Sequence, residues 1–199
     1  MRYILLFIAI FTFSCKYNIT SPVGTIKDYS ANSGKLFYTS SDSSADDIEM
    51  TLMKNKHSLG KYKIVVSNGN STAILTNIKA ALDKNPSFDN VEIDLSLTKI
   101  TNIPKEMFTN TTNLGKITLP DTVKKIEEKA FSGCSSLSYI RFSGGLTNIG
   151  TNAFSNCSAL TVLLFPDGLT TIGGSAFSDC SFLKDLFFPA SLTSIGSNA

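Results

Sequence analysis

Apolar residues in the second half of the chain recur at a fixed spacing of 23 residues. Leucine marks one position of this repeat, and phenylalanine and cysteine mark two others. The leucines are Leu114, Leu137, Leu160 and Leu183, and the cysteines are Cys134, Cys157 and Cys180. A fixed period of this length is typical of a solenoid, in which each repeat forms one coil and packs only against its neighbours.

Each repeat also contains a short stretch in which inward and outward residues should alternate. Ile117 and Leu119 show this alternation in one repeat, and Leu163 and Phe165 show it in another. Alternating side chains point to opposite faces of a β-strand, so we expect one short strand per coil and a parallel sheet across the coils. Pro120 lacks an amide hydrogen and should end its strand. The A-F-S-x-C-S segment should then return the chain on the opposite side.

A diverged first copy of the repeat begins at about Val91 and fits the pattern if one residue is inserted before Ile100. It has Thr111 in place of the cysteine, as expected of a terminal coil that does not face another repeat on both sides. The predicted solenoid therefore spans residues 91–199 in about 4.5 coils. Ala199 aligns with an alanine in mid-repeat, so the last coil is incomplete. This indicates either a fragment of a longer array or an open edge that forms an edge-to-edge homodimer.

Glycine follows the repeated isoleucine in three coils, at Gly150, Gly173 and Gly196. A glycine at one fixed position suggests a tight or left-handed turn. Glu127 holds the same position in an earlier coil. The position therefore prefers glycine without requiring it.

The unit L-x-x-I-x-(L/F)-P-x-x-(L/V)-x-x-I-G-x-x-A-F-x-x-C-x-x resembles the BspA-like class of bacterial leucine-rich repeats over roughly residues 90–199. Ser143 in place of proline, Glu127 in place of glycine and Thr111 are departures that leave the architecture intact. The resemblance implies an α/β-type leucine-rich-repeat solenoid with short parallel strands stacked into a sheet. It also implies export to the cell surface, where members of the class are associated with adhesion to host matrix proteins and to other cells.

Residues 46–90 predict a small α/β cap at the N-terminal end of the solenoid. The expected elements are a helix from Asp46 to near Gly60, a strand over 62–66, and a helix capped by Asn70 or Ser71 that ends near Lys84. Such a unit would cover the first strand of the solenoid, whose open edge would otherwise pair with other chains.

Residues 1–14 have the pattern of a signal peptide, with an apolar run over Tyr3–Phe11 and small residues at Thr12 and Ser14. The apolar run is far shorter than the roughly 20 residues that a bilayer crossing needs. Bacterial lipoprotein processing cleaves directly before a cysteine, and here the next residue is Cys15. We therefore expect a covalent lipid on Cys15, whose acyl chains would anchor the protein to a membrane. The alternative is a secreted protein in which Cys15 is a free N-terminal thiol.

Residues 15–45 are rich in Ser, Asn, Thr, Gly and Asp, and their apolar residues are scattered. Such a segment cannot bury a shared apolar face, which predicts a flexible tether between the lipid anchor and the cap.

The composition restricts the chemistry that this chain can perform. The formal net charge is +2, with 18 Lys plus Arg against 16 Asp plus Glu and no long basic run, which argues against a nucleic-acid partner. His57 is the one histidine, and the four cysteines form no C-x-x-C pair, so we expect no metal, no cofactor other than the lipid and no enzymatic activity. Cysteines that are stacked one coil apart cannot enclose a tetrahedral ion and should lie in the core. A disulfide between two of them stays open as an alternative.

The outward-facing residues of the predicted strands should form two columns along the sheet, because each neighbour of an inward residue points outward. The first column is Lys116, Tyr139, Val162 and Asp185, and the second column is Thr118, Arg141, Leu164 and Phe187. Tyrosine and arginine often anchor protein interfaces, and the apolar members would form one exposed patch. We expect these columns to contact a protein ligand. The alternative is that further coils or a dimer partner cover them.

Two classes of function follow from these observations. The first is a lipid-anchored adhesin at the bacterial outer membrane or cell surface that binds proteins of the host matrix or of a neighbouring cell. The second is a structural or scaffolding envelope lipoprotein, or a truncated nonfunctional fragment of a longer repeat protein.

Overall fold

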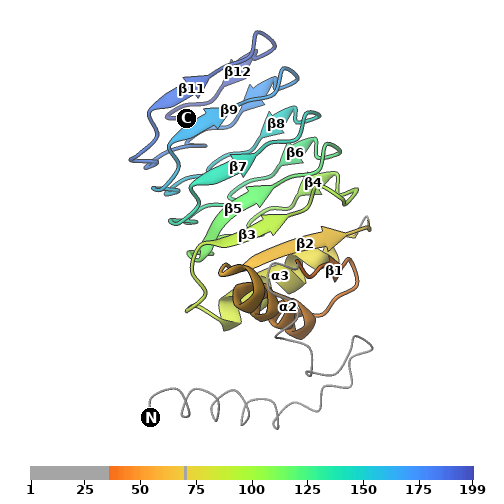
Figure 1. The fold of residues 1–199 in the computed structure, drawn as a ribbon. Coiled ribbons are helices and arrows are strands. Elements are labelled where there is room, and N and C mark those ends of the chain that lie inside the picture. The colour runs from red at the N-terminus through yellow and green to blue at the C-terminus, as the bar shows by residue number, and fades with distance from the viewer. Residues whose placement is uncertain (1–35, 70) are drawn as a thin grey trace, which may run out of the picture. The chain divides into compact units, whose positions relative to one another are not determined.

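The computed structural model describes residues 36–69 and 71–199 (Figure 1). The predicted signal peptide, Cys15 and residues 16–35 of the predicted tether lie outside the described residues, and so does Asn70. Two helices stand at the N-terminal end of the described chain, and short parallel strands follow them coil after coil. This is the expected repeat solenoid with an N-terminal α/β unit.

The N-terminal unit consists of β1 (Thr39–Ser40), α2 (Ala45–Leu59), β2 (Lys63–Ser67) and α3 (Ala73–Lys84). Helix α2 starts at a capping box, in which Ser44 Oγ accepts a hydrogen bond from the Asp47 amide and the Asp47 carboxylate accepts one from the Ser44 amide. It ends at Gly60, whose left-handed φ of 72° suits glycine. Helix α3 has Thr72 as its N-cap, one residue after the expected Ser71, whose hydroxyl accepts a hydrogen bond from the Ala73 amide.

The sequence places residues 36–44 in the tether, but the structure packs them on the N-terminal unit. Strand β1 pairs in parallel with β2. The fully buried Asn55 accepts a hydrogen bond from the Phe37 amide (2.8 Å) and donates one to the Phe37 carbonyl (2.9 Å). A buried amide side chain needs such partners, so these residues belong to the folded unit and not to a tether.

Each coil contains two strands, whereas the sequence predicts one. The strands are β3 (Val91–Asp94), β4 (Asn102–Ile103), β5 (Leu114–Thr118), β6 (Lys125–Ile126), β7 (Tyr139–Arg141), β8 (Asn148–Ile149), β9 (Val162–Leu164), β10 (Thr171–Ile172), β11 (Asp185–Phe187) and β12 (Ser194–Ile195). The even-numbered strands of the coils form a parallel sheet in the order β12-β10-β8-β6-β4. These strands are only two residues long, which is why alternation over the sequence does not reveal them.

The odd-numbered strands of the coils continue the sheet of the N-terminal unit, in the order β1-β2-β3-β5-β7. Because β2 pairs in parallel with β3, the N-terminal unit covers the first edge of the solenoid as expected. The register shifts by one residue between Val91 and Glu92, where β3 meets β5. This shift offsets the extra residue that the first copy carries before Ile100.

Stacked phenylalanines run through the core of the coils. The centroid of the Phe131 ring lies 5.4 Å from that of Phe108 and 5.1 Å from that of Phe154. The centroids of the Phe154 and Phe177 rings lie 5.4 Å apart. Offset stacking of this kind adds to the free energy gained from burial of each ring. In the last coil, the inward residues are exposed because no described coil packs on them; they are Leu186, Phe188 and Ile195.

The repeated glycines are required by close packing and not by a left-handed turn, which corrects the expectation from the sequence. Gly150 and Gly173 do not have positive φ angles. A Cβ atom on Gly173 would lie 2.5 Å from the Thr151 amide nitrogen, and one on Gly150 would lie 2.7 Å from the Glu127 carbonyl carbon. The left-handed residue of the coil comes two positions later, at Asn152 and Ser175.

Candidate protein-binding face

The outward side chains of β3, β5, β7, β9 and β11 form one surface, which we call the strand face. Lys116 lies opposite Tyr139 and Thr118 lies opposite Arg141 in the β5–β7 pair. In the β9–β11 pair, the opposing residues are Val162 with Asp185 and Leu164 with Phe187. The structure thus brings together the residues of both predicted columns within each strand pair, because side-chain alternation and parallel register place them side by side.

The two strand pairs are not joined by backbone pairing, which the sequence did not reveal. Strand β7 is the last strand of the larger sheet, and β9 with β11 forms a separate two-stranded sheet. The same coils stay connected on their other side, where β8 pairs with β10 and the Phe154 amide donates to the Ala176 carbonyl (2.8 Å). The strand face therefore consists of two blocks held by one continuous core.

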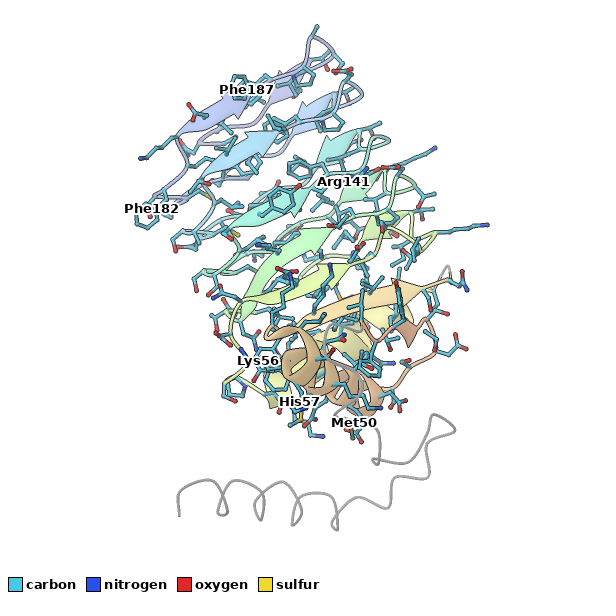
Figure 2. The ribbon with its side chains drawn as sticks, viewed as in Figure 1. Met50, Lys56, His57, Arg141, Phe182 and Phe187 are labelled. Carbon is cyan, nitrogen blue, oxygen red and sulfur yellow. The ribbon has the colours of Figure 1, made fainter. Side chains whose placement is uncertain are left out.

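The block that includes β9 and β11 carries large exposed apolar side chains. Leu164 is 69% exposed, Phe187 is 61% exposed and Val162 is 46% exposed. Figure 2 labels Phe187 on β11. Tyr139 on β7 is 50% exposed. We call these four residues the apolar patch. Contiguous apolar surface on an exposed sheet face is typical of an interaction site.

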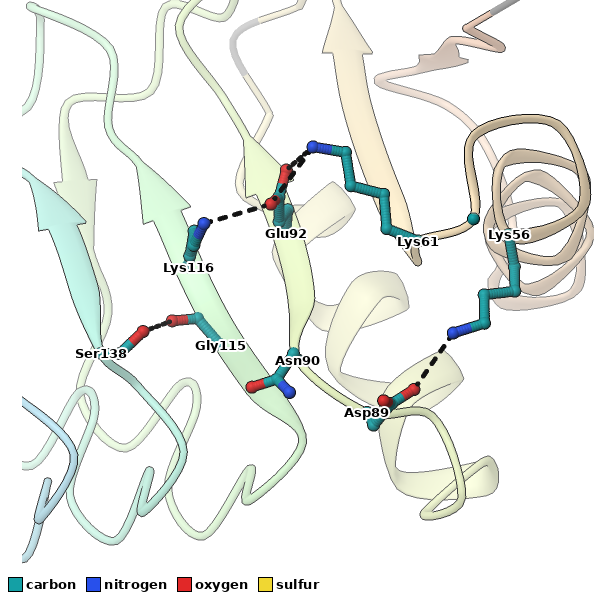
Figure 3. A pocket seen from close by; sticks show the side chains of 9 residues that line it. Lys56, Lys61, Asp89, Asn90, Glu92, Gly115, Lys116 and Ser138 are labelled. Atoms are coloured by element: carbon teal, nitrogen blue, oxygen red, sulfur yellow. Dashed lines mark hydrogen bonds and ion pairs between the residues drawn. The ribbon is translucent and has the colours of Figure 1, made fainter. Parts of the chain in front are cut away.

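The block nearer the N-terminal unit is charged. Arg141 lies 3.5 Å from Asp121, and Lys116 lies 3.4 Å from Glu92 on the neighbouring strand. Partial burial raises the pKa of the Glu92 carboxyl, but hydrogen bonds and charges from Lys61 and Lys116 outweigh that effect and hold its pKa below the usual range (Figure 3). The strand face thus changes from charged to apolar along the solenoid.

Glu92 and Lys61 are candidate site residues that the sequence reasoning missed. Glu92 occupies the outward position of β3, one strand before Lys116. The same alternation that selects Lys116 would have selected Glu92 had it been extended into the diverged first copy. Lys61 has no such signal, because it lies between α2 and β2 and meets Glu92 only in three dimensions.

The opposite sheet presents polar side chains in place of the apolar patch. Three threonine hydroxyls on this side donate to the carbonyl of the preceding coil; they are Thr147 to Lys124, Thr170 to Thr147 and Thr193 to Thr170, at 3.0 to 3.1 Å. We call this surface the threonine face. The hydroxyl hydrogens of these three threonines are already used within the protein.

The repeated cysteines are core residues, as expected. Cys134, Cys157 and Cys180 are buried and free, so the alternative of a disulfide between two of them is wrong. Each thiol donates to the carbonyl of a phenylalanine in the preceding coil, as Cys134 does to Phe108 at 3.0 Å. Burial raises the pKa of Cys134 to about 12 and that of Cys180 to about 11, so neither thiol ionises near neutral pH. Within residues 36–69 and 71–199, no group of three or more His, Cys, Asp or Glu could hold a metal ion.

Comparison with protein families agrees with this geometry. A BspA type leucine rich repeat region matches residues 101–199 in six copies. The repeat region belongs to the BspA-type leucine-rich repeat family. Leucine-rich repeats generally form protein-binding surfaces. A comparison with curated proteins finds no match.

Several solved structures are similar to part of the chain. A leucine rich repeat protein from T. pallidum is 31% identical with a TM-score of 0.52, over 54% of this chain and 52% of that chain. The pneumococcal vaccine antigen PcpA is 24% identical with a TM-score of 0.47, over 55% and 37% of the two chains. A leucine rich cell surface protein from Faecalibacterium prausnitzii A2-165 is 25% identical with a TM-score of 0.36, over 67% and 39%. The chain thus spans about half or less of the length of these proteins.

Among the described residues, no helix combines the length and the apolar character needed to span a bilayer.

Proposed function

We propose that this protein is a lipid-anchored surface module that binds other proteins through its strand face and thereby mediates adhesion. The observation that carries this proposal is the apolar patch of Tyr139, Val162, Leu164 and Phe187, which is exposed on the strand face, whereas the threonine face is polar. Exposed apolar side chains on a flat sheet lose water when a partner covers them, and this supplies the free energy of binding. Arg141 at the border of the patch adds a charged anchor of the type found in protein interfaces.

Binding to immobilised host matrix proteins and to neighbouring bacterial cells tests this proposal. We expect the Tyr139→Ala/Arg141→Ala double variant to lose most of the binding, because both side chains are exposed and neither supports the core. A matched control is Asn148→Ala/Thr171→Ala, which changes two outward residues of β8 and β10 on the other sheet. Unchanged binding by a folded Tyr139→Ala/Arg141→Ala variant, or an equal loss in the control, would remove the strand face as the binding site.

The lipid anchor is tested separately at Cys15. Metabolic labelling with an alkyne fatty acid should mark the wild-type protein and not the Cys15→Ser variant, because the thioether needs the Cys15 thiol and the amide-linked chain needs the amino group of a mature protein that begins with this cysteine. Labelling that survives the substitution would overturn the assignment of Cys15.

Protease treatment of intact cells tests exposure at the surface. An adhesin should be digested, whereas a scaffold that faces the inside of the envelope should be spared. Protection of the protein on intact cells, together with digestion after lysis, would replace the adhesin proposal with the scaffold.

A further inference from the structure

Three lysine ammonium groups surround one partly buried carboxylate at the N-terminal end of the strand face. The distances from the Glu92 carboxylate are 3.2 Å to Lys61 Nζ, 3.4 Å to Lys116 Nζ and 3.9 Å to Lys63 Nζ. The Glu92 side chain is only 18% exposed. One carboxylate cannot neutralise three ammonium groups, so this cluster carries an excess of positive charge.

The lysines are presented by neighbouring backbone segments and not by one mobile loop. Lys63 pairs in register with Glu92 between β2 and β3, and Glu92 pairs with Lys116 between β3 and β5. Lys61 reaches the same carboxylate from the turn after α2 (Figure 3). The carboxylate therefore preorganises the site, because it holds the ammonium groups close to each other before any ligand binds.

Lys61, Glu92 and Lys116 line an open cleft of about 250 Å³, which we call the Glu92 pocket; Lys56, Asp89 and Ser138 also border it. Lys56 and Asp89 lie 3.5 Å apart and balance each other's charge. Asp94, the next outward carboxylate on β3, accepts a hydrogen bond from the Ser96 amide (3.0 Å). The lysines Lys56, Lys61, Lys63 and Lys116 outnumber the carboxylates Asp89, Glu92 and Asp94, so one positive charge remains in excess around the pocket.

The Glu92 pocket is continuous with the apolar patch. Lys116 lies directly opposite Tyr139 in the register of β5 and β7. Paired strands are about 4.8 Å apart, and β9 lies beyond β7 without pairing with it, so Val162 lies at least about 10 Å from Lys116 along the face. An extended chain covers this distance with about three residues. A single peptide segment that crosses the strands could therefore reach both sites at once.

We propose that the Glu92 pocket binds a carboxylate of the protein partner, so that the recognised segment carries an acidic side chain about three residues from aromatic or branched apolar side chains. This inference rests on the proposed function of the strand face and names the chemistry of its partner. The charge of the pocket selects an anion, and the adjoining patch selects an anion that is attached to apolar side chains. Asp185 within the face and Asp121 beside Arg141 disfavour an anionic membrane surface, since their charges would be pressed against it.

Selection of a displayed random peptide library against the full chain tests this proposal. We expect the enriched peptides to combine Asp or Glu with aromatic or branched apolar residues. Selection against Lys61→Gln/Lys116→Gln should keep the apolar preference and lose the acidic one. The matched control is Lys124→Gln/Lys125→Gln, which removes the same two charges at β6 in the other sheet and should enrich the same acidic peptides as the wild type.

Binding of one enriched peptide then measures the contribution of the pocket. Replacing its acidic residue with the corresponding amide should weaken binding to the wild type about fivefold, and the loss should shrink at high salt. The same replacement should leave the affinity of Lys61→Gln/Lys116→Gln unchanged, which shows that the peptide carboxylate and the two lysines are energetically coupled.

Three other outcomes would overturn the inference, and each of them has a different consequence for the proposed function. Enriched peptides that are apolar without acidic residues leave the strand face as a binding site and remove the role of the Glu92 pocket. Failure to enrich any peptide removes both the inference and the proposed function. Co-sedimentation with phosphatidylglycerol vesicles that is lost in Lys61→Gln/Lys116→Gln, and kept in the control, would assign the lysines to lipid instead.

Discussion

The strand face and the threonine face come from the same repeats, yet they differ in what their side chains leave available. On the threonine face, Thr147 and Thr170 hydroxyls donate to backbone carbonyls of the preceding coil, so they hold the coils together. On the strand face, Leu164 and Phe187 are exposed and support no other part of the described chain. The difference teaches that side chains on one side of each coil can join successive coils while those on the other side stay exposed to solvent.

The largest effect should come from the core that both faces share. Phe131→Ala removes a fully buried ring that stacks on Phe108 and Phe154, and should lower the free energy of unfolding by about 3–5 kcal/mol. Denaturant unfolding monitored by circular dichroism measures this loss. A loss below about 1 kcal/mol would mean that the coils do not depend on this stack.

Removing side chains of the apolar patch should weaken partner binding and leave the free energy of unfolding nearly unchanged. Leu164→Ser/Phe187→Ser should weaken partner binding by about 2–4 kcal/mol and change the free energy of unfolding by less than about 0.5 kcal/mol, because both side chains are exposed. On the threonine face, Thr170→Val should do the opposite: it loses a hydrogen bond worth about 1 kcal/mol and leaves binding unchanged. Calorimetry of binding and denaturant unfolding of both variants give the comparison. Similar behaviour of the two variants would abolish the distinction between the faces.

A glycine variant with a smaller expected effect tests how closely the coils approach each other beside the threonine face. Gly173→Ala would place a Cβ atom 2.5 Å from the Thr151 amide nitrogen, and should destabilise the protein by about 1–3 kcal/mol. Gly144→Ala is the matched control, because its nearest neighbour would be 4.0 Å away, at Asp121 Oδ1. Thermal unfolding compares the two. Equal midpoints would show that the coil spacing gives way easily at Gly173.

The smallest effect is the pH dependence that Glu92 contributes. Its pKa in the folded protein lies below the usual value of 4.5, so the carboxyl stabilises the fold above that value. This stabilisation should be lost as the pH falls from about 4.5 through the folded pKa, and its size should be below about 1 kcal/mol because Lys61 and Lys116 are half exposed. Acid unfolding curves of the wild type and of Glu92→Gln should converge at low pH. Parallel curves down to pH 2 would show that the lysines do not hold the carboxylate.

Much of the candidate site could be predicted because alternation is a local property. The residues on either side of Ile117 and Ile140 must point outward if these two point inward, and the constant period places Lys116 beside Tyr139. The same reasoning predicted the burial of Cys134 from its place in the repeat. Each of these features is determined within one repeat and then copied by the period.

Other features depended on contacts between coils or between the coils and the N-terminal unit. The role of Gly173 was misread because a glycine in the sequence does not distinguish a left-handed turn from a close approach of a neighbouring backbone. The separation of β7 from β9 has no sequence signal that we can identify, although Ser143 replaces proline in that coil.

The sequence by itself determined the period, the identity of the buried and outward positions, and the presence of helices before the solenoid. Only the tertiary structure decided which surfaces these positions share: that β2 continues the sheet, that Lys61 and Lys116 meet at Glu92, and that threonine hydroxyls join successive coils. The physical reason is the range of the interactions. Side-chain direction repeats every two residues along a strand, whereas strand register and charge clusters join residues that are far apart in the chain.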